Sequence, residues 1–320
     1  MSLQEGLIVR STGSWYDVTL AGGETISCRM IGKFRLDGKK LTNPVAVGDR
    51  VLVELEVQTD DKQTGVIKEI LDRKNYVIRQ SPRKKHFLHI LAANIDQALL
   101  IVTIRDPKLK QGFIDRFLLM TEPYDIPAHI IFNKGDIYTD DDLNVYQYLK
   151  ETYEKIGYSC YITSALENKG IQQITKLIEG KSSLISGQSG VGKSSLLNRL
   201  HPDLELKTKS ISDYTGKGQH TTTFAEMFDL GAGTKIIDSP GIKTLGFNHM
   251  EVQDVAHNFK EFFAASSGCK FQDCTHRNEP KCAIKTGIEE GEISELRYGN
   301  YLQIISEVED QNYWERHSEY

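Results

Sequence analysis

One eight-residue segment near the middle of the chain constrains the fold more than any other feature. Residues 187–194 read Gly-Gln-Ser-Gly-Val-Gly-Lys-Ser, which fits the pattern GxxxxGK[ST]. The apolar run 184–186 precedes the segment, and a helix-like run begins at Ser195. A glycine-rich turn between a buried strand and a helix N-terminus presents backbone N–H groups to phosphate oxygens. The sequence therefore predicts a phosphate-binding loop on a sheet whose strands alternate with helices.

The residue types in this loop fit a nucleotide bound with Mg²⁺. Lys193 would reach the β- and γ-phosphates, and the Ser194 hydroxyl would be a ligand of Mg²⁺. The other predicted nucleotide contacts of the loop are Gly187, Gln188, Ser189, Gly190, Val191, Gly192 and Ser195.

A segment upstream of this loop indicates which base is bound. Residues 133–136 read Asn-Lys-Gly-Asp, follow an apolar run and fit the pattern NKxD. The Asp136 carboxylate can accept hydrogen bonds from both N1 and the exocyclic amine of guanine, whereas adenine offers no matching pair of donors. Asn133 would hold the base and tie neighbouring loops together, and the stem of Lys134 would cover the face of the base.

A second upstream segment fits the same base. Residues 163–165 read Thr-Ser-Ala and follow another apolar strand. Ser164 and Ala165 are the predicted contacts, because the Ala165 N–H could donate to O6 of guanine. Each segment alone could be a surface turn. Both, however, lie at strand ends, where open α/β sheets bind their ligands. Together they favour GTP over ATP.

Two downstream segments complete the expected nucleotide site. Residues 236–241 read Ile-Ile-Asp-Ser-Pro-Gly and fit DxxG. Asp238 would hold Mg²⁺ through a water, and the Gly241 N–H would contact the γ-phosphate. Residues 218–223 form a polar loop between the phosphate loop and Asp238. We expect Thr222, one of its three threonines, to close over Mg²⁺ and the γ-phosphate; a Ser/Thr-rich surface loop is the alternative.

The order of these segments is unusual. An ordinary GTPase has its phosphate loop first and its base-reading segments last, whereas here 133–136 and 164–165 precede residue 187. The sequence therefore predicts a circularly permuted domain, a rearrangement that proteins tolerate when the original termini lie close together. The segment 238–241 then leads directly into the C-terminal region. A nucleotide-dependent shift there would pull on that region.

The expected fold class is α/β, a permuted P-loop domain with a mostly parallel, doubly wound sheet, flanked by two smaller domains. Near-continuous apolar runs that alternate with helix-length segments favour such a sheet. The predicted strands are 98–104, 128–132, 159–162, 183–186 and 234–237, and the predicted helices are 113–121, 142–156, 171–178 and 194–200. The expected boundaries are 1–72 for an N-terminal barrel, 73–89 for a basic linker, 90–246 for the GTPase domain and 247–320 for a helical C-terminal domain.

The N-terminal part reads as an all-β domain. Short alternating runs separated by glycine-containing turns predict five strands, at 6–11, 16–20, 25–30, 50–57 and 65–71. Five short strands in some seventy residues favour a small RNA-binding barrel of the OB type. A β-sandwich or an SH3-like barrel is the alternative.

The segment 73–89 carries the strongest local charge excess, with six Lys or Arg residues, two histidines and no acid. Tyr76 and Phe87 bracket these cations, a combination that suits contacts with a phosphate backbone and occasional base stacking. A solvated linker is the alternative.

Three cysteines and one histidine lie within fourteen residues near the C-terminal end. The spacing is Cys269-x₄-Cys274-x-His276-x₅-Cys282. Three thiolates and one imidazole suit a closed, tetrahedral, structural Zn²⁺ site. The other cysteines, Cys28 and Cys160, are expected to be small core residues.

Composition excludes several classes of protein. Lys and Arg number 39 against 44 Asp and Glu, a net charge of −5, so the chain does not coat nucleic acid over its whole surface. Five cysteines in 320 residues do not form a secreted disulfide scaffold. No apolar stretch approaches the roughly 18 to 20 residues of a membrane span. We expect a cytoplasmic monomer without membrane contact.

These segments together resemble the RsgA family of small ribosomal subunit biogenesis GTPases, which are circularly permuted. The resemblance covers essentially the whole chain, from the barrel through NKGD, GQSGVGKSS, GQHTTT and DSPG to the cysteine cluster. It implies binding of GTP and GDP, hydrolysis stimulated by the 30S subunit with its 16S rRNA, and a role in late maturation of that subunit. It also implies zinc at Cys269, Cys274, His276 and Cys282.

The catalytic residue is the open question of the sequence. The position after DxxG, where many GTPases carry a glutamine that orients water, is Ile242. An aliphatic side chain cannot orient water, so slow intrinsic hydrolysis is expected. His220 is the nearest substitute, and the resemblance points to it as well; its alternative role is to cap the loop.

Two other functions fit parts of the sequence. One is a permuted GTPase of the RbgA type that acts on the large subunit. The barrel, the zinc cluster and the glycine at position 190 of the phosphate loop all argue against this assignment. The other is a GTP-gated RNA-binding adaptor in which hydrolysis is incidental.

Overall fold

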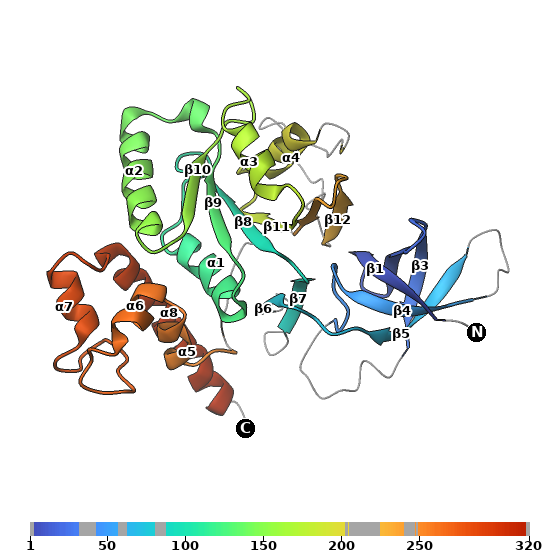
Figure 1. Cartoon of the computed structure of the whole chain (residues 1–320). Helices are drawn as coiled ribbons and strands as arrows, with labels where there is room; N and C mark the ends of the chain where they lie inside the picture. Colours follow the sequence, from blue (N-terminus) through green and yellow to red (C-terminus); the bar gives the residue numbers. More distant parts are fainter. Residues whose placement is uncertain are drawn as a thin grey trace.

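The computed structural model describes residues 3–31, 43–56, 63–80, 88–201, 204, 225–239, 247 and 249–317. Three parts follow one another along the chain (Figure 1). They are a group of strands near the N-terminus, a central sheet with its helices, and a group of helices at the C-terminal end.

The N-terminal strands close into a five-stranded barrel. They are β1 (Leu3–Ser11), β2 (Trp15–Leu20), β3 (Thr25–Met30), β4 (Arg50–Leu55) and β5 (Thr64–Ile70). They pair in the order β1-β2-β3-β5-β4, and β4 pairs back with β1. Only β3 and β5 run parallel within this ring. The predicted OB-type barrel is confirmed, and one closed ring excludes a sandwich of two sheets.

Alternating side chains fill the barrel, as the two-residue period of a strand requires. Val18, Cys28 and Val53 are fully buried. Gly65 leaves room for this core, because a Cβ at that position would lie 2.5 Å from Val53 Cγ1. Cys28 is therefore a core residue, as predicted.

The segment 73–89 differs from the expected linker. It contains β6 (Tyr76–Gln80), which pairs antiparallel with β7 (Leu88–Ala93); residues 81–87 lie outside the described part. Ile78 and Ile90 are buried and pack together with Ala46 of the barrel. Alternating apolar residues within the basic segment thus make a hairpin that packs on its neighbours.

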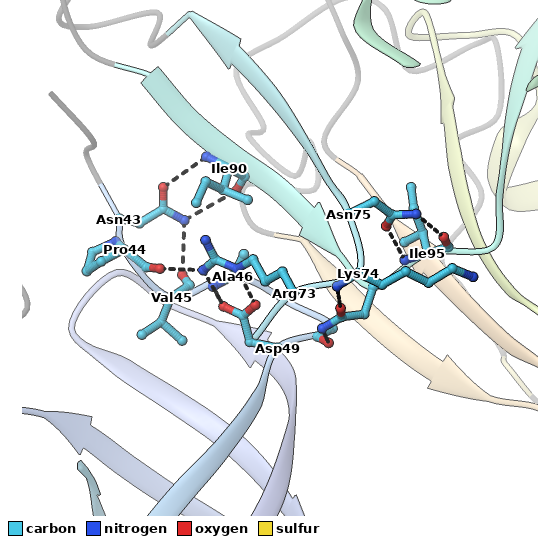
Figure 2. A network of polar contacts seen from close by, with 12 residues as sticks. Asn43, Pro44, Val45, Ala46, Asp49, Arg73, Lys74, Asn75, Ile90 and Ile95 are labelled. Atoms are coloured by element: carbon cyan, nitrogen blue, oxygen red, sulfur yellow. Dashed lines mark hydrogen bonds and ion pairs between the residues drawn. The ribbon is translucent and has the colours of Figure 1, made fainter. Parts of the chain in front are cut away.

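Polar contacts fasten the start of this segment to the barrel (Figure 2). Arg73 donates two hydrogen bonds of 2.7 Å to the fully buried carboxylate of Asp49 and one of 2.6 Å to the Pro44 carbonyl. Lys74 Nζ lies 3.1 Å from Asp96 Oδ1, next to the central sheet. Arg73 therefore fastens the start of this segment to residues 44–49, and its charge is neutralised by Asp49.

Among the described residues, six strands form the central part of a sheet that continues from β12 into β1 of the barrel; their order is β10-β9-β8-β11-β13-β12. The first five run parallel and β12 is antiparallel to β13, which confirms the mostly parallel, doubly wound sheet. Strand β12 was not predicted, because two of its four residues are acidic and it contains no continuous apolar run. The six strands of the central sheet are β8 (Gln97–Val102), β9 (Ala128–Phe132), β10 (Ser159–Ile162), β11 (Ser182–Gly187), β12 (Glu226–Asp229) and β13 (Lys235–Asp238).

Helices cover both faces of this sheet (Figure 1). The side chain of Leu100 in β8 belongs to the core beneath α1 and α2, whereas that of Leu99 belongs to the core beneath α3 and α4. Successive residues of β8 thus serve opposite faces, so the strand is apolar throughout. The helical segments are α1 (Phe113–Thr121), η2 (Glu122–Tyr124), η3 (Gly135–Ile137), α2 (Asp140–Glu154), α3 (Ile171–Ile178) and α4 (Lys193–Leu200).

The C-terminal part is helical, as predicted, and packs beside α1 (Figure 1). Phe259, Phe262 and Tyr301 form a buried aromatic cluster with ring centroids 5.0 to 5.4 Å apart. Among the described helices, none combines the length and apolar character that a bilayer crossing requires. The helices are α5 (Val252–His257), α6 (Lys260–Ser266), α7 (Ala283–Glu289) and α8 (Glu295–His317).

Candidate nucleotide site and metal centre

The predicted nucleotide contacts gather at one edge of the central sheet. The parallel strands β9, β10, β11 and β13 all end there. Asn133 follows β9, Thr163 follows β10, the phosphate loop follows β11, and Asp238 is the last residue of β13. The fold therefore assembles in space the segments that the permuted chain order separates.

Two glycines let the phosphate loop pass close to its neighbours. A Cβ on Gly187 would lie 2.4 Å from the Ile101 carbonyl oxygen. Gly192 precedes α4 with φ +85°, and a Cβ there would lie 2.5 Å from Asn133 Nδ2. Only glycine satisfies both the left-handed backbone and the close approach at residue 192.

Lys193 is held inside the site by groups at the end of β13. Its Nζ lies 2.7 Å from Asp238 Oδ1 and donates a 2.5 Å hydrogen bond to the Ser239 carbonyl. Both side chains of the ion pair are nearly buried, with 11% and 7% exposed. The ammonium thus occupies the position from which it could turn toward a bound phosphate.

The surroundings of Asp238 show whether the site fits Mg²⁺. Its Oδ1 is buried and accepts no hydrogen bond of acceptable geometry among the described residues; Lys193 contacts it as a charge. A phosphate that drew the ammonium away would leave this oxygen to a hydrated cation. Oxygen ligands of this kind, together with the Ser194 hydroxyl, are those that Mg²⁺ prefers.

Asn133 joins the segment predicted to read the base to the phosphate loop. Its Nδ2 donates a 2.9 Å hydrogen bond to the Val191 carbonyl, and its Oδ1 accepts one of 3.0 Å from Thr163 Oγ1. Its own carbonyl accepts a 2.8 Å bond from the Tyr138 hydroxyl. Only 1% of Asn133 is exposed, so the residue serves as a rigid junction of three loops.

The other residues predicted to read the base are also held in place. Ser164 Oγ donates a 2.5 Å hydrogen bond to Asp136 Oδ1, which orients the carboxylate. Lys134 has a left-handed backbone, with φ 63°, and its Nζ donates a 2.7 Å bond to the Asp106 carbonyl. Arg199 Nε donates a 2.8 Å bond to the Ala165 carbonyl.

Several of these partners carry no recognisable sequence signal. Thr163, Tyr138, Asp106 and Arg199 support the site through single hydrogen bonds to residues of the motifs. Only Thr163 lies within a predicted motif. A further group of predicted residues, His220, Thr222, Gly241 and Ile242, lies outside the described residues.

The cysteine cluster comes together in the segment that connects α6 to α7. The four donor atoms of Cys269, Cys274, His276 and Cys282 all lie within 4.8 Å of one another. His276 Nδ1 lies 3.7 Å from Cys269 Sγ and 3.5 Å from Cys282 Sγ. The Tyr298 hydroxyl donates a 2.7 Å bond to the His276 carbonyl and so supports the loop that carries the imidazole.

The donor set fits a tetrahedral metal ion. With Zn–S near 2.3 Å and Zn–N near 2.0 Å, tetrahedral angles place N and S about 3.5 Å apart, which agrees with 3.5 and 3.7 Å here. Burial raises the pKa of the Cys274 thiol to about 12. A divalent cation would supply the charge that stabilises the thiolate. The cysteines form no disulfide.

The fold and the nucleotide site define the class of the protein. It is a circularly permuted P-loop GTPase with an OB-type barrel before the GTPase domain. Its residues 70–248 match the model of the RsgA GTPase family, and residues 5–67 match that of the RsgA N-terminal domain. The chain therefore belongs to the RsgA family.

The similarity to known relatives and to solved structures covers nearly the whole chain. The small ribosomal subunit biogenesis GTPase RsgA of Christiangramia forsetii is 48% identical over 309 residues, or 97% of this chain and 98% of the relative. That of Bacteroides fragilis (strain YCH46) is 47% identical with the same coverage. The crystal structure of YjeQ from Thermotoga maritima has a TM-score of 0.75 and 34% identity, covering 96% and 99% of the two chains. YloQ, described as a circularly permuted GTPase, has a TM-score of 0.70 and 28% identity, covering 97% and 96%.

Proposed function

We propose that this protein is a GTPase that binds the 30S ribosomal subunit and assists its late maturation, hydrolysing GTP to GDP with stimulation by the subunit. The observation that carries the proposal is the junction at Asn133. Its Nδ2 donates from the segment 133–136 to the Val191 carbonyl of the phosphate loop, which supports one site for the guanine base and the phosphates. The names of the relatives, small ribosomal subunit biogenesis GTPases, are the basis for proposing the 30S subunit as the partner.

Lys193 is the proposed phosphate ligand. On binding GTP, it would exchange its contacts with Asp238 and Ser239 for the β- and γ-phosphates. Ser194 and Thr222 would hold Mg²⁺ directly, and Asp238 would hold it through a water. Bound Mg²⁺ offsets the charge on the β- and γ-phosphates.

The barrel offers a route by which RNA could influence hydrolysis. Strand β12 begins at Glu226, shortly after the predicted switch segment 218–223, and pairs with β1 of the barrel through Arg10. A partner that holds the barrel would thereby constrain the chain next to the switch. Ordering of a switch by a partner is a common way to raise GTP turnover. We propose 16S rRNA as this partner. We also propose that the protein acts in the cytoplasm and as a monomer.

Turnover with purified subunits tests the proposal. We expect the 30S subunit to raise GTP hydrolysis at least about tenfold, since ordered catalytic groups account for still larger effects in other GTPases. The 50S subunit should have no effect, and ATP should not be hydrolysed. Stimulation by 50S would favour the RbgA-type alternative, and stimulation by neither would favour the adaptor; both results contradict the proposal.

A second arm of the same assay tests His220. The variant His220→Ala should lose most of the 30S-stimulated rate, roughly ten- to a hundredfold, because it lacks the group that positions water. Its affinity for GDP should stay unchanged. Full stimulated turnover in this variant would remove His220 from the mechanism.

We also propose one structural Zn²⁺ ion at Cys269, Cys274, His276 and Cys282. Protein purified without chelators should contain about one equivalent of zinc, because the four donors complete the coordination of a single tetrahedral ion. No position is then left open for a reacting water, which is why we call the ion structural. Cys274→Ser should reduce the zinc content well below that of the matched variant Cys160→Ser, which alters a buried cysteine of β10. Equal zinc in both variants, or none in the unaltered protein, would contradict the site.

A further inference from the structure

Arg199 connects the phosphate-binding helix to the loop that would read guanine O6. It lies in the last turn of α4, the helix that begins at the phosphate loop. Its Nε donates a 2.8 Å hydrogen bond to the carbonyl oxygen of Ala165, a residue 34 positions earlier in the chain. No sequence motif includes Arg199.

Apart from the bonds that join Ala165 to Arg199 and Ser164 Oγ to Asp136, the loop 164–169 is closed by hydrogen bonds among its own residues. Ser164 and Lys169 exchange two backbone hydrogen bonds of 3.0 and 3.1 Å, and the Glu167 N–H donates a 3.0 Å bond to Ser164 Oγ. None of these bonds uses the N–H or the carbonyl of Ala165. The Ala165 N–H shares a peptide plane with the Ser164 carbonyl and is therefore oriented by the bond from Lys169, whereas the Ala165 carbonyl, in the next peptide, is held only from outside the loop.

Two contacts from outside the loop reach Ala165. Its methyl group is buried in the core that α3 and α4 share with the sheet, which fixes where the residue lies. Leu166, the next residue, is 76% exposed and provides no second apolar anchor. The bond from Arg199 to the carbonyl adds a directional tie between the loop and α4, which apolar packing of one methyl group does not provide.

We infer that Arg199 is a positioning residue for guanine recognition, which holds the loop that carries the Ala165 N–H against α4 and so keeps this N–H within reach of O6. This inference rests on the proposed guanine site. The aim of this N–H affects specificity, because guanine presents an acceptor at position 6 whereas adenine presents an amine, a donor that an N–H cannot bind.

Three nucleotides distinguish this role from a general structural one. GDP and IDP both carry O6, whereas the diphosphate of 2-aminopurine riboside lacks it and reports its own binding by fluorescence. For Arg199→Met, which keeps an apolar stem but has no N–H donor, we expect GDP and IDP to bind about fivefold more weakly, the value of one modest hydrogen bond. The affinity for the 2-aminopurine nucleotide should not change.

Two further variants complete the test. Arg199→Gln retains an N–H donor and should recover part of the lost GDP affinity. Lys176→Met, which removes an exposed cation from the last turn of α3, is the matched control and should bind all three nucleotides as the unaltered protein does. Equal weakening of all three nucleotides by Arg199→Met, or unchanged GDP binding, would overturn the inference. Failure of the guanine site itself would appear instead in the unaltered protein, as equal affinity for GDP and ADP.

Discussion

Replacing Asp136 with asparagine is expected to convert a guanine site into a xanthine site. The carboxylate would accept hydrogen bonds from N1 and from the exocyclic amine of guanine. Xanthine carries a carbonyl oxygen in place of that amine, and the side-chain amide introduced by Asp136→Asn offers the matching N–H donor. Ser164 Oγ, which now donates to Asp136 Oδ1, would still find an acceptor in the amide oxygen. The new side chain therefore fits the pocket but reads a different base.

The expected change in nucleotide affinity is large. Two hydrogen bonds to a charged acceptor contribute about 3 kcal/mol or more together, so Asp136→Asn should weaken GDP binding on the order of a hundred- to a thousandfold. XDP binding should increase by a similar factor. Fluorescence titrations with both nucleotides measure the exchange. Asp140→Asn, at an exposed position in the first turn of α2, is the matched control. Unchanged preference for GDP in Asp136→Asn would show that this carboxylate does not read the base.

Replacing Arg297 with methionine should destabilise the protein more than the loss of any surface ion pair. Arg297 of α8 is 2% exposed and donates a 2.5 Å hydrogen bond to Asp115 of α1. It also donates bonds of 2.5 and 2.9 Å to the two carboxylate oxygens of Glu261 in α6. Tyr153 and Asn300 donate further bonds of 2.9 and 2.5 Å to Asp115. The guanidinium is thus the shared cation of two carboxylates within the interior.

The expected loss follows from the unpaired charges that the substitution leaves behind. Removing one partner of a buried ion pair costs about 3–5 kcal/mol, because the remaining carboxylates lose their cation but stay away from water. We therefore expect Arg297→Met to lower the free energy of unfolding by about that amount in a urea titration. Arg277→Met, which breaks the half-exposed pair with Glu309, should cost no more than about 1 kcal/mol.

A compensated variant separates charge from packing. Adding Asp115→Asn and Glu261→Gln to Arg297→Met removes the two stranded charges, so part of the lost stability should return. If Arg297→Met alone costs as little as Arg277→Met, the buried network does not hold the C-terminal helices to α1.

This network bears on how nucleotide state could reach the C-terminal part. The permuted order led to the expectation that a shift after Asp238 pulls on that region. Residues 240–246, which would carry the pull, lie outside the described part of the chain. The described joint between α8 and α1 is buried and ionic. A displacement of the C-terminal helices would therefore have to move α1 with them or break these bonds.

Local patterns predicted the elements that a short stretch of sequence determines. The apolar runs 128–132 and 159–162 are strands with the predicted bounds, and 113–121 and 171–178 are helices with the predicted bounds. The strands are continuous apolar runs and the helices carry apolar residues at helical spacing, so the pattern is visible within the segment. The phosphate loop and the cysteine cluster also lie within short windows of sequence.

Contacts between distant segments had no such signal. Arg297 and Asp115 are 182 residues apart, and neither lies in a motif. Arg73, which reads as part of a basic run, is neutralised by Asp49 from another part of the chain. The hydrogen bonds from Tyr138 and Arg199 likewise depend on the packing of whole elements. Pairing of this kind is set by the tertiary fold, and one sequence without its structure does not reveal it.

The central claim is that loops from two separated regions of the chain form one guanine nucleotide pocket. Titration of the unaltered protein with fluorescent GDP and ADP, with Mg²⁺ present, tests it most directly. The account predicts that GDP binds and that ADP binds at least about a hundredfold more weakly, because adenine offers no donor pair to Asp136. Equal affinity for the two nucleotides, or no binding of GDP, would contradict it.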